Sequence, residues 1–277
     1  MTTSVWTKGL GATGSIYGTM QPLVTTGDVW FVDSASGTDD DSPRGKNELY
    51  PLATLVQAVD NAVDGDIIVL ASTHSETLSA NGYLSLDKRV TILGQGQSAG
   101  VPCATLNLDY EGGVPLEFGA SEAVGCCVSN VRFTLGASLE SSNCGISVVV
   151  GNILFDTCYF EVRRCTMMRY YGCAAGSLNV NCTFVNVTAS PATPVEGGHA
   201  IYMAGSSHVR MKRLTLDAGA VGWKNGIALD ASTGGQQIDL RLEDLTLLRG
   251  SDVDVYPTSS GQYNISNESS GQGRVHW

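Results

Sequence analysis

The sequence predicts an all-β protein: a single-stranded, right-handed parallel β-helix of about eight coils with an N-terminal capping α-helix. Three observations support this prediction. One amphipathic helical pattern precedes a chain that otherwise consists of short strand patterns. From residue 66 onward, a similar segment returns roughly every 20 to 33 residues. Glycine is frequent, at 33 of 277 residues, and supplies the turns that many short strands need.

Each repeated segment opens with a short alternating strand and closes with an apolar-x-apolar pair. Because side chains alternate across a strand, one residue of each pair should point inward and stack on its equivalent in the next coil. We expect Cys158 to lie over Cys182, and Phe160 over Phe184. The opening strands begin near Leu116, Ile146, Met168, Ile201, Ile227 and Val253, and the closing pairs are Val131/Phe133, Cys158/Phe160, Cys182/Phe184, Leu214/Leu216 and Leu245/Leu247.

A β-sandwich is the alternative fold, since it also contains many short strands separated by turns. The longer repeat, which spans two or three strands, and the single helix ahead of the repeats favour the β-helix.

A helix of about three turns is predicted after the first strand. Thr54 and Gln57 fit a capping box at its start, and Gly65 lies where a left-handed stop residue is expected. An amphipathic helix must bury its apolar face, so we expect it to cover the open end of the β-helix. The residues with helical spacing are Leu55, Val56, Val59, Ala62 and Val63.

Four segments organise the chain: an extended N-terminal arm (1–27), a first strand with an acidic loop and the capping helix (28–65), the β-helix (66–261) and a C-terminal tail (262–277). The arm carries one charge, and either docks on a neighbouring chain or is a mobile terminus. The tail is either a trailing coil or a contact strand. The candidate partner-contact residues are Trp6, Leu10, Ile16, Tyr17, Met20 and Trp277.

Composition argues against several classes of partner. The net charge of −11 disfavours nucleic acid, because binding phosphates requires clustered Lys and Arg. No apolar run is long enough to span a membrane, and no signal peptide is recognisable. The eight cysteines fall between Cys103 and Cys182 without a C-x-x-C pair, so we expect buried free thiols and no zinc site. We expect no cofactor.

Cleavage of a polysaccharide would require a particular set of residues. Glycoside hydrolysis needs two carboxylates across the scissile bond, but the candidate carboxylates fall singly along the strands. Aromatic residues for sugar stacking make up only 7% of the chain, and the tryptophans are scattered. We therefore expect no catalytic residues and no enzyme. The candidates were Asp217, Asp230, Asp239, Glu243, Asp244, Asp252 and Asp254, with Arg210, Lys212 and Arg213 near Asp217 in sequence.

Metal ligands were sought among the histidines and the acidic loop. His74, His199, His208 and His276 show no metal-ligand spacing, and His74 is interpreted as a hydrogen-bond donor in a turn. Oxygens of Asp33 and residues 39–41 suit Ca²⁺, but solvated loop acidity is the preferred interpretation. We expect no metal site.

The stretch 27–78 resembles the first segment of pectate-lyase-like right-handed β-helix proteins of tailed-phage virions. The resemblance lies in a WFVDS strand (30–34), a G-x-D loop (37–39), a P-x-A-T-L-x-x-A helix (51–58), a G-D-x-I-x-V strand (65–69 here) and an H-x-E-T segment (74–77). It implies a trimer-forming structural protein on a virion surface.

From this resemblance we expect a homotrimeric capsid decoration, or cement, protein that is made in the host cytoplasm and adheres to the major capsid protein. The alternative is a tail receptor-binding or polysaccharide-processing spike protein that contacts a host surface glycan. The decoration role is preferred because a tail spike normally adds further domains before and after its β-helix. A rigid solenoid also offers a flat, preformed surface for adhesion.

Overall fold

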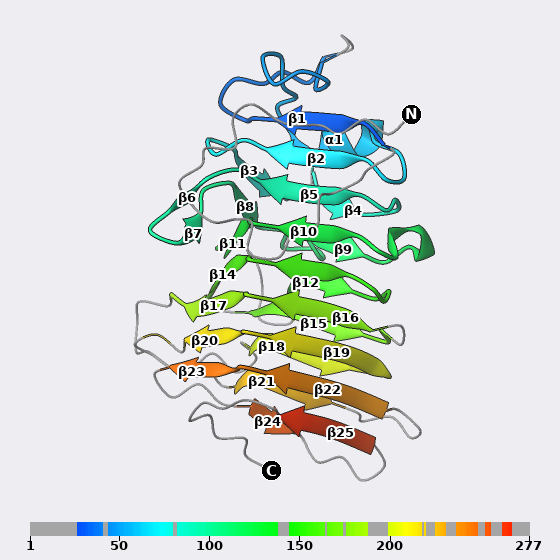
Figure 1. The fold of residues 1–277 in the computed structure, drawn as a ribbon, viewed down its shortest axis with the longest axis vertical. Helices are drawn as coiled ribbons and strands as arrows, with labels where there is room; N and C mark the ends of the chain where they lie inside the picture. Colours follow the sequence, from blue (N-terminus) through cyan, green and yellow to red (C-terminus); the bar gives the residue numbers. More distant parts are fainter. Residues whose placement is uncertain are drawn as a thin grey trace.

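The computed structural model describes residues 27–40, 44–79, 82–137, 144–163, 165–173, 176–187, 199–217, 219, 225–230, 237–248, 253–255 and 262–267. These residues form a parallel β-helix whose strands stack from β1 at one end to β25 at the other (Figure 1). The predicted fold class is therefore confirmed. The six candidate partner-contact residues lie outside the described residues. Within the described part of the chain, no helix has the length and apolar character needed to cross a bilayer.

Three parallel sheets form the faces of the β-helix, and we name them A, B and C. Sheet A contains β1 (Val29–Val32), β2 (Ile67–Leu70), β5 (Thr91–Gly94), β10 (Cys127–Ser129), β13 (Leu154–Asp156), β16 (Ser177–Val180), β19 (Ser207–Lys212), β22 (Gln237–Glu243) and β25 (Gln262–Asn267). Sheet B contains β3 (Ser75–Leu78), β8 (Thr105–Leu108), β11 (Arg132–Leu135), β14 (Tyr159–Val162), β17 (Thr183–Asn186), β20 (Thr215–Asp217) and β23 (Thr246–Leu248).

Sheet C contains β4 (Leu84–Ser85), β9 (Leu116–Phe118), β12 (Cys144–Val148), β15 (Thr166–Tyr171), β18 (His199–Ala204), β21 (Asn225–Asp230) and β24 (Val253–Val255). A short antiparallel hairpin, β6 (Gln97–Ser98) and β7 (Val101–Pro102), and a 3-10 turn, η1 (Ser121–Ala123), interrupt the coils. The chain visits sheets A, B and C in turn, and parallel crossovers of this kind are right-handed. β25 pairs with β22, so sheet A continues into the segment 262–277 that was predicted as a tail.

Each of the first five predicted repeats contributes one strand to sheet C and one to sheet B. The six predicted opening positions form one column of sheet C, in which Ile146 lies between Leu116 and Met168, and Ile201 between Met168 and Ile227. In sheet B, Phe160 pairs with Phe184, and their stacked rings lie 4.3 Å apart between centroids. Cys158 and Cys182 directly precede β14 and β17, and their side chains interact with each other, so both predicted stacks are confirmed.

The turn between sheets A and B uses one backbone residue in the left-handed region in each of five successive coils. A main-chain N–H at this corner donates to a carbonyl of the next coil, as from Thr157 to Val180 at 2.9 Å. Asparagine tolerates this conformation, whereas a β-branched residue such as threonine is strained in it. The corner residues, with φ between 52° and 56°, are Asn130, Thr157, Asn181, Arg213 and Asp244.

The interior is apolar, and it includes most of the cysteines as free thiols, as predicted. Burial raises the pKa of the Cys126 and Cys144 thiols to about 11 and that of Cys165 and Cys173 to about 12. These four thiols are therefore protonated and unreactive at neutral pH. The six buried cysteines are Cys126, Cys144, Cys158, Cys165, Cys173 and Cys182.

The capping helix α1 (Leu55–Asn61) lies at the β1 and β2 end of sheet A and buries Leu55, Ala58 and Val59 (Figure 1). It is shorter than the predicted three turns. The backbone at Ala62 is already extended, so the helix ends before the left-handed Gly65. Val63, predicted to belong to the apolar face, consequently points outward and is 63% exposed.

Candidate functional site

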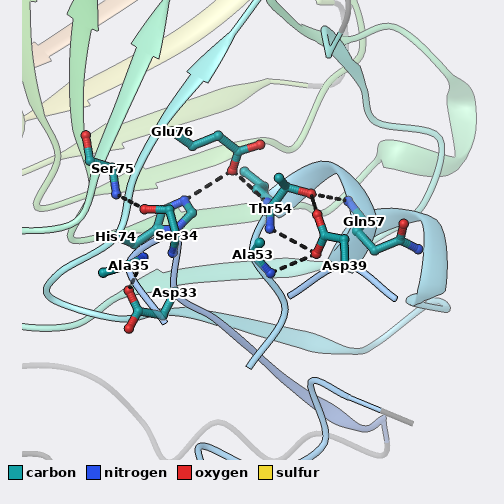
Figure 2. Close-up of polar contacts among 11 residues, drawn as sticks. Asp33, Ser34, Ala35, Asp39, Ala53, Thr54, Gln57, His74, Ser75 and Glu76 are labelled. Carbon is teal, nitrogen blue, oxygen red and sulfur yellow. Dashed lines mark hydrogen bonds and ion pairs between the residues drawn. The ribbon is translucent and has the colours of Figure 1, made fainter. Parts of the chain in front are cut away.

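Asp39 caps the start of α1. Its carboxylate accepts hydrogen bonds from the backbone N–H groups of Ala53 at 2.7 Å and Thr54 at 3.2 Å, and from the Thr54 hydroxyl at 2.6 Å (Figure 2). The Thr54 hydroxyl in turn accepts from the N–H of Gln57, as the capping box predicted. In a complete capping box, the Gln57 side chain would also accept a hydrogen bond from the N–H of Thr54. Here the Gln57 side chain donates to Asn61, and the Thr54 N–H donates to Asp39 instead.

Asp33 serves a separate turn. Its carboxylate accepts hydrogen bonds from the Ser36 hydroxyl, the Ala35 N–H and the Thr73 hydroxyl. Burial disfavours the charged form, but these hydrogen bonds outweigh it and lower the pKa of Asp33. Asp33 and Asp39 thus bind different backbone segments. Among the described residues, no group of three or more His, Cys, Asp or Glu side chains is arranged to hold a metal ion. Asp41 lies outside that set.

His74 and Glu76 join the first coil to the cap (Figure 2). The N–H of Ser34 donates to His74 Nδ1 at 3.1 Å, so this nitrogen carries no proton and a neutral ring has its proton on Nε2. That Nε2 lies 3.1 Å from Glu76 Oε2, which also accepts from the N–H of Leu55 at 2.6 Å. The imidazole is fully buried. His74 was predicted to donate a hydrogen bond in a turn; it instead accepts one from the N–H of Ser34, and this polar cluster has a structural role.

A different part of the surface has the features of a binding site. An open groove of about 490 Å³ crosses β13, β16, β19 and β22 on the outer face of sheet A. Four strands spaced by about 4.8 Å give the groove a length of roughly 14 Å along the axis of the β-helix. Its lining residues are Asn152, Ile153, Leu154, Gly176, Ser177, Leu178, His208, Val209, Arg210, Asp239 and Arg241.

One row of side chains in this groove runs along the axis of the β-helix and changes from apolar to positively charged. The register places Leu154 beside Leu178, Leu178 beside Arg210, and Arg210 beside Arg241. Both leucines are partly exposed, so one half of the groove has an apolar floor and the other half carries two guanidinium groups. Such a floor can support the apolar face of a ligand while the arginines bind its polar groups.

Acidic side chains accompany the arginines. Glu243 accepts a hydrogen bond from Arg210 Nε at 2.7 Å and lies 3.6 Å from Lys212 Nζ. The hydrogen bond from Arg210 is the main cause that lowers the pKa of Glu243. Asp239 lies 3.6 Å from His208 Nδ1 and 3.9 Å from Arg241 Nε.

His208 and Asp239 occupy the same register position on adjacent strands, and the imidazole is 41% exposed to the groove. An imidazole close to a carboxylate is a combination that general acid–base catalysis uses. The two arginines next to it can neutralise an anionic ligand. The groove can therefore bind an anion, and it contains groups that can transfer a proton.

The structure brings together only some of the carboxylates considered from the sequence. Asp239 and Arg210 line the groove, and Glu243 lies beside it in contact with Arg210 and Lys212. Asp217, the last residue of β20, accepts a hydrogen bond from the N–H of Gly219. Asp230, the last residue of β21, accepts one from the Tyr202 hydroxyl. Asp244 and Arg213 are corner residues. Asp254 is on β24, and Asp252 lies outside the described residues. The sequence analysis did not assign His208 to a site. The signal for it was that His208, Arg210 and Lys212 occupy alternate positions of one strand and therefore lie on the same face of the sheet.

Comparison with known proteins gives a similarity of fold. No family model matches the chain, and no curated protein matches it. The solved structures include a similar one, the crystal structure of pectate lyase Pel9A, with a TM-score of 0.54 and 11% sequence identity. The similarity covers 90% of this chain and 68% of the other. At this identity, it supports a pectate-lyase-like parallel β-helix and establishes the fold alone.

The prediction that the chain is not an enzyme is contradicted and must be corrected, because the similar solved structure is that of an enzyme. Of the two sequence arguments behind that prediction, the one from isolated carboxylates also fails. Folding gathers Asp239 and Glu243, which looked isolated, on one face with His208 and two arginines, and it forms a groove that no sequence pattern had indicated. Catalysis is therefore compatible with this fold and this site.

Proposed function

We propose that the chain is a virion protein of a tailed phage, a homotrimeric decoration protein that adheres to the major capsid protein on the head surface. The observation that carries the proposal is the 27–78 segment, whose phage-type motifs supply the first strand and the side chains that hold the capping helix in place. The WFVDS strand is β1, the G-x-D loop supplies Asp39, and the H-x-E-T segment supplies His74 and Glu76.

The architecture suits adhesion. Inter-strand hydrogen bonds link neighbouring coils in all three sheets, so the β-helix is a stiff rod with flat faces. A three-fold assembly would present the same face three times, and several weak contacts would then act together. The net charge of −11 favours a cationic partner surface.

Particle composition and location test the proposal. We expect quantitative gel analysis of purified virions to give hundreds of copies, and a particle reconstruction to place trimers on the head. A yield of only a few to a few tens of copies would contradict a decoration role. Deletion of residues 1–27 should abolish particle binding without unfolding the coils, and retained binding would remove the arm from the proposal.

The groove on sheet A favours a second candidate, a tail protein that binds or processes a host surface polysaccharide. An open groove with an apolar floor, two arginines and an acid–base pair suits a sugar chain. Incubation with host capsule or lipopolysaccharide should then shorten the glycan, as measured by gel filtration. Unchanged glycan length with hundreds of copies per particle would exclude this candidate.

A further inference from the structure

Three large apolar side chains are exposed in the segment that caps the β-helix. Leu49 is 79% exposed, Tyr50 60% and Val63 63%, and they are three of the eight exposed large apolar residues in the described part of the chain. Single exposed apolar residues are normal on a protein surface, whereas a group of them marks an interaction site. We call these three residues the cap patch.

Trp30 connects the two parts of the cap patch. In the loop that carries Tyr50, Lys46 Nζ lies 3.5 Å from the centre of the Trp30 ring. The indole N–H of Trp30 donates to Asp66 Oδ2 at 2.9 Å, and the same oxygen accepts from the N–H of Val63 at 3.0 Å. The loop with Tyr50 and the turn with Val63 are therefore linked through one side chain at this end of the molecule.

The N-terminal segment enters the fold at this surface. Gly27 lies against the turn before β2, where a Cβ on this glycine would come within 2.6 Å of the carbonyl carbon of Gly65. The next residue, Asp28, donates its N–H to Asp66 at 2.6 Å. These contacts fix the point of entry beside the turn that carries Val63.

The 26 residues ahead of Gly27 have a charge that suits this surface. They contain one charged residue, Lys8, and no acidic residue, although the whole chain has 27 acidic residues. The segment 27–66 is acidic, with nine Asp and Glu residues against Arg44 and Lys46. An acidic partner would be repelled there, whereas the N-terminal segment would not.

The N-terminal segment is also long enough to cover the cap patch. An extended chain spans about 3.3–3.6 Å per residue, so Leu23 and Val24 lie within roughly 10–14 Å of Gly27, and Met20 within about 25 Å. Because the segment is covalently attached, its effective concentration at the patch is high. A few apolar contacts therefore suffice, whereas a separate protein would need a much larger interface.

We propose that the cap patch binds the N-terminal segment of its own chain, with Met20, Leu23 and Val24 covering the exposed apolar side chains. This inference goes beyond the proposed function and does not depend on it. Docking would anchor the base of the arm at a fixed point of the β-helix. Residues 1–19 would remain available for the particle contact proposed above.

Photo-crosslinking of the full chain identifies what covers the patch. Tyr50→p-benzoylphenylalanine places a photoreactive side chain at an exposed position, so the fold should be retained. We expect a crosslink to residues 20–24 within one chain, which migrates as a monomer on a denaturing gel and is mapped by peptide mass spectrometry. Tyr171→p-benzoylphenylalanine is the matched control, because Tyr171 is 52% exposed at the end of β15.

Three results of the crosslinking would overturn the proposal. A product of twice the mass, joined to residues 20–24 of a second chain, would show that the arm of a neighbouring copy occupies the patch. Absence of any crosslink between position 50 and the arm would show that the arm does not dock there. An equal crosslink from position 171 would show contact without specificity.

Substitutions then test the contribution of the patch itself. Chymotrypsin cleavage after Leu23, followed by mass spectrometry, measures access to the docked residues, and cleavage after Leu10 in the same arm is the internal reference. The combined variant Leu49→Ser, Tyr50→Ser and Val63→Ser removes the apolar contacts. We expect cleavage after Leu23 to become at least fivefold faster and cleavage after Leu10 to stay unchanged.

A control variant of the same composition changes three exposed apolar residues on later coils: Leu248→Ser, Tyr171→Ser and Val149→Ser. It should be cleaved at the same rates as the original protein. Equal acceleration in this control, or no acceleration in the patch variant, would contradict the inference. Neither experiment uses virions, so failure of the decoration role would leave this inference standing, and failure of docking would leave the decoration role untouched.

Discussion

Glu76 accepts a hydrogen bond from the backbone N–H of Leu55 at 2.6 Å, which fastens the first residue of α1 to the first coil. The same oxygen lies 3.1 Å from His74 Nε2. The cap is thus attached to the β-helix through a carboxylate as well as through the apolar face of α1.

Replacing Glu76 should loosen the cap. Glu76→Ala leaves the Leu55 N–H without this acceptor, and such a loss costs about 1–3 kcal/mol. We expect the free energy of unfolding in urea to fall by roughly 1–3 kcal/mol and amide exchange to accelerate in α1. Glu122→Ala is the control, because its side chain contacts the exposed Ser121 hydroxyl. Equal stability of the two variants would contradict this role of Glu76.

Thr157 is a β-branched residue with φ of 55° at a corner where Asn130 and Asn181 have the same conformation. Thr157→Asn should raise the free energy of unfolding by about 1 kcal/mol, because it relieves backbone strain. The same change at Thr183, within β17, should be neutral or slightly destabilising, since Asn is disfavoured in strands. Thermal and urea unfolding measure both. A destabilised Thr157→Asn variant would show that its hydroxyl contact to Asp156 outweighs the strain.

Phe160 lies between Phe133 and Phe184 in the interior, with ring centroids 5.1 and 4.3 Å away. Phe160→Ala should lower the free energy of unfolding by about 3–5 kcal/mol, since it removes apolar contacts on both sides and leaves a cavity. Phe160→Leu keeps most of the volume and should cost less than half as much. Similar losses in the two variants would show that ring stacking, rather than volume, determines stability here.

Stability should decline at alkaline pH because of the buried thiols. The thiols of Cys126, Cys144, Cys165 and Cys173 ionise at about 11 to 12 in the folded chain, against an ordinary value of 9.0. The unfolded chain therefore loses these protons first, so stability is retained below about pH 9 and lost as the pH rises. At pH 10 each thiol should cost about 1–1.5 kcal/mol, or about 4–6 kcal/mol for the four.

Urea unfolding at pH 7 and pH 10 measures this decline. Cys144→Ala should reduce the difference between the two pH values by about 1 kcal/mol, whatever its effect at pH 7. Cys103→Ala is the control, because Cys103 is only partly buried. An unchanged difference in Cys144→Ala would show that another group causes the alkaline loss.

Most of the fold follows from local sequence patterns. The columns of sheets B and C could be predicted because alternation places residues such as Ile146 and Phe160 inward wherever their strands are aligned. The end of α1 could not. Gly65 is left-handed as expected, but the chain leaves the helix at Ala62, where Asp66 accepts hydrogen bonds from the N–H of Val63 and the indole of Trp30. These contacts depend on how the cap meets sheet A.

The sequence by itself determined the coil repeat, the apolar interior and the presence of a cap, because each depends on spacings of a few residues. Only the tertiary structure decided which polar residues meet. His208 and Asp239 are 31 positions apart, and Glu76 and Leu55 are 21 apart, so their contacts depend on the register between coils and the length of each loop. For this reason the groove on sheet A, and with it the compatibility of this chain with catalysis, became evident only from the folded chain.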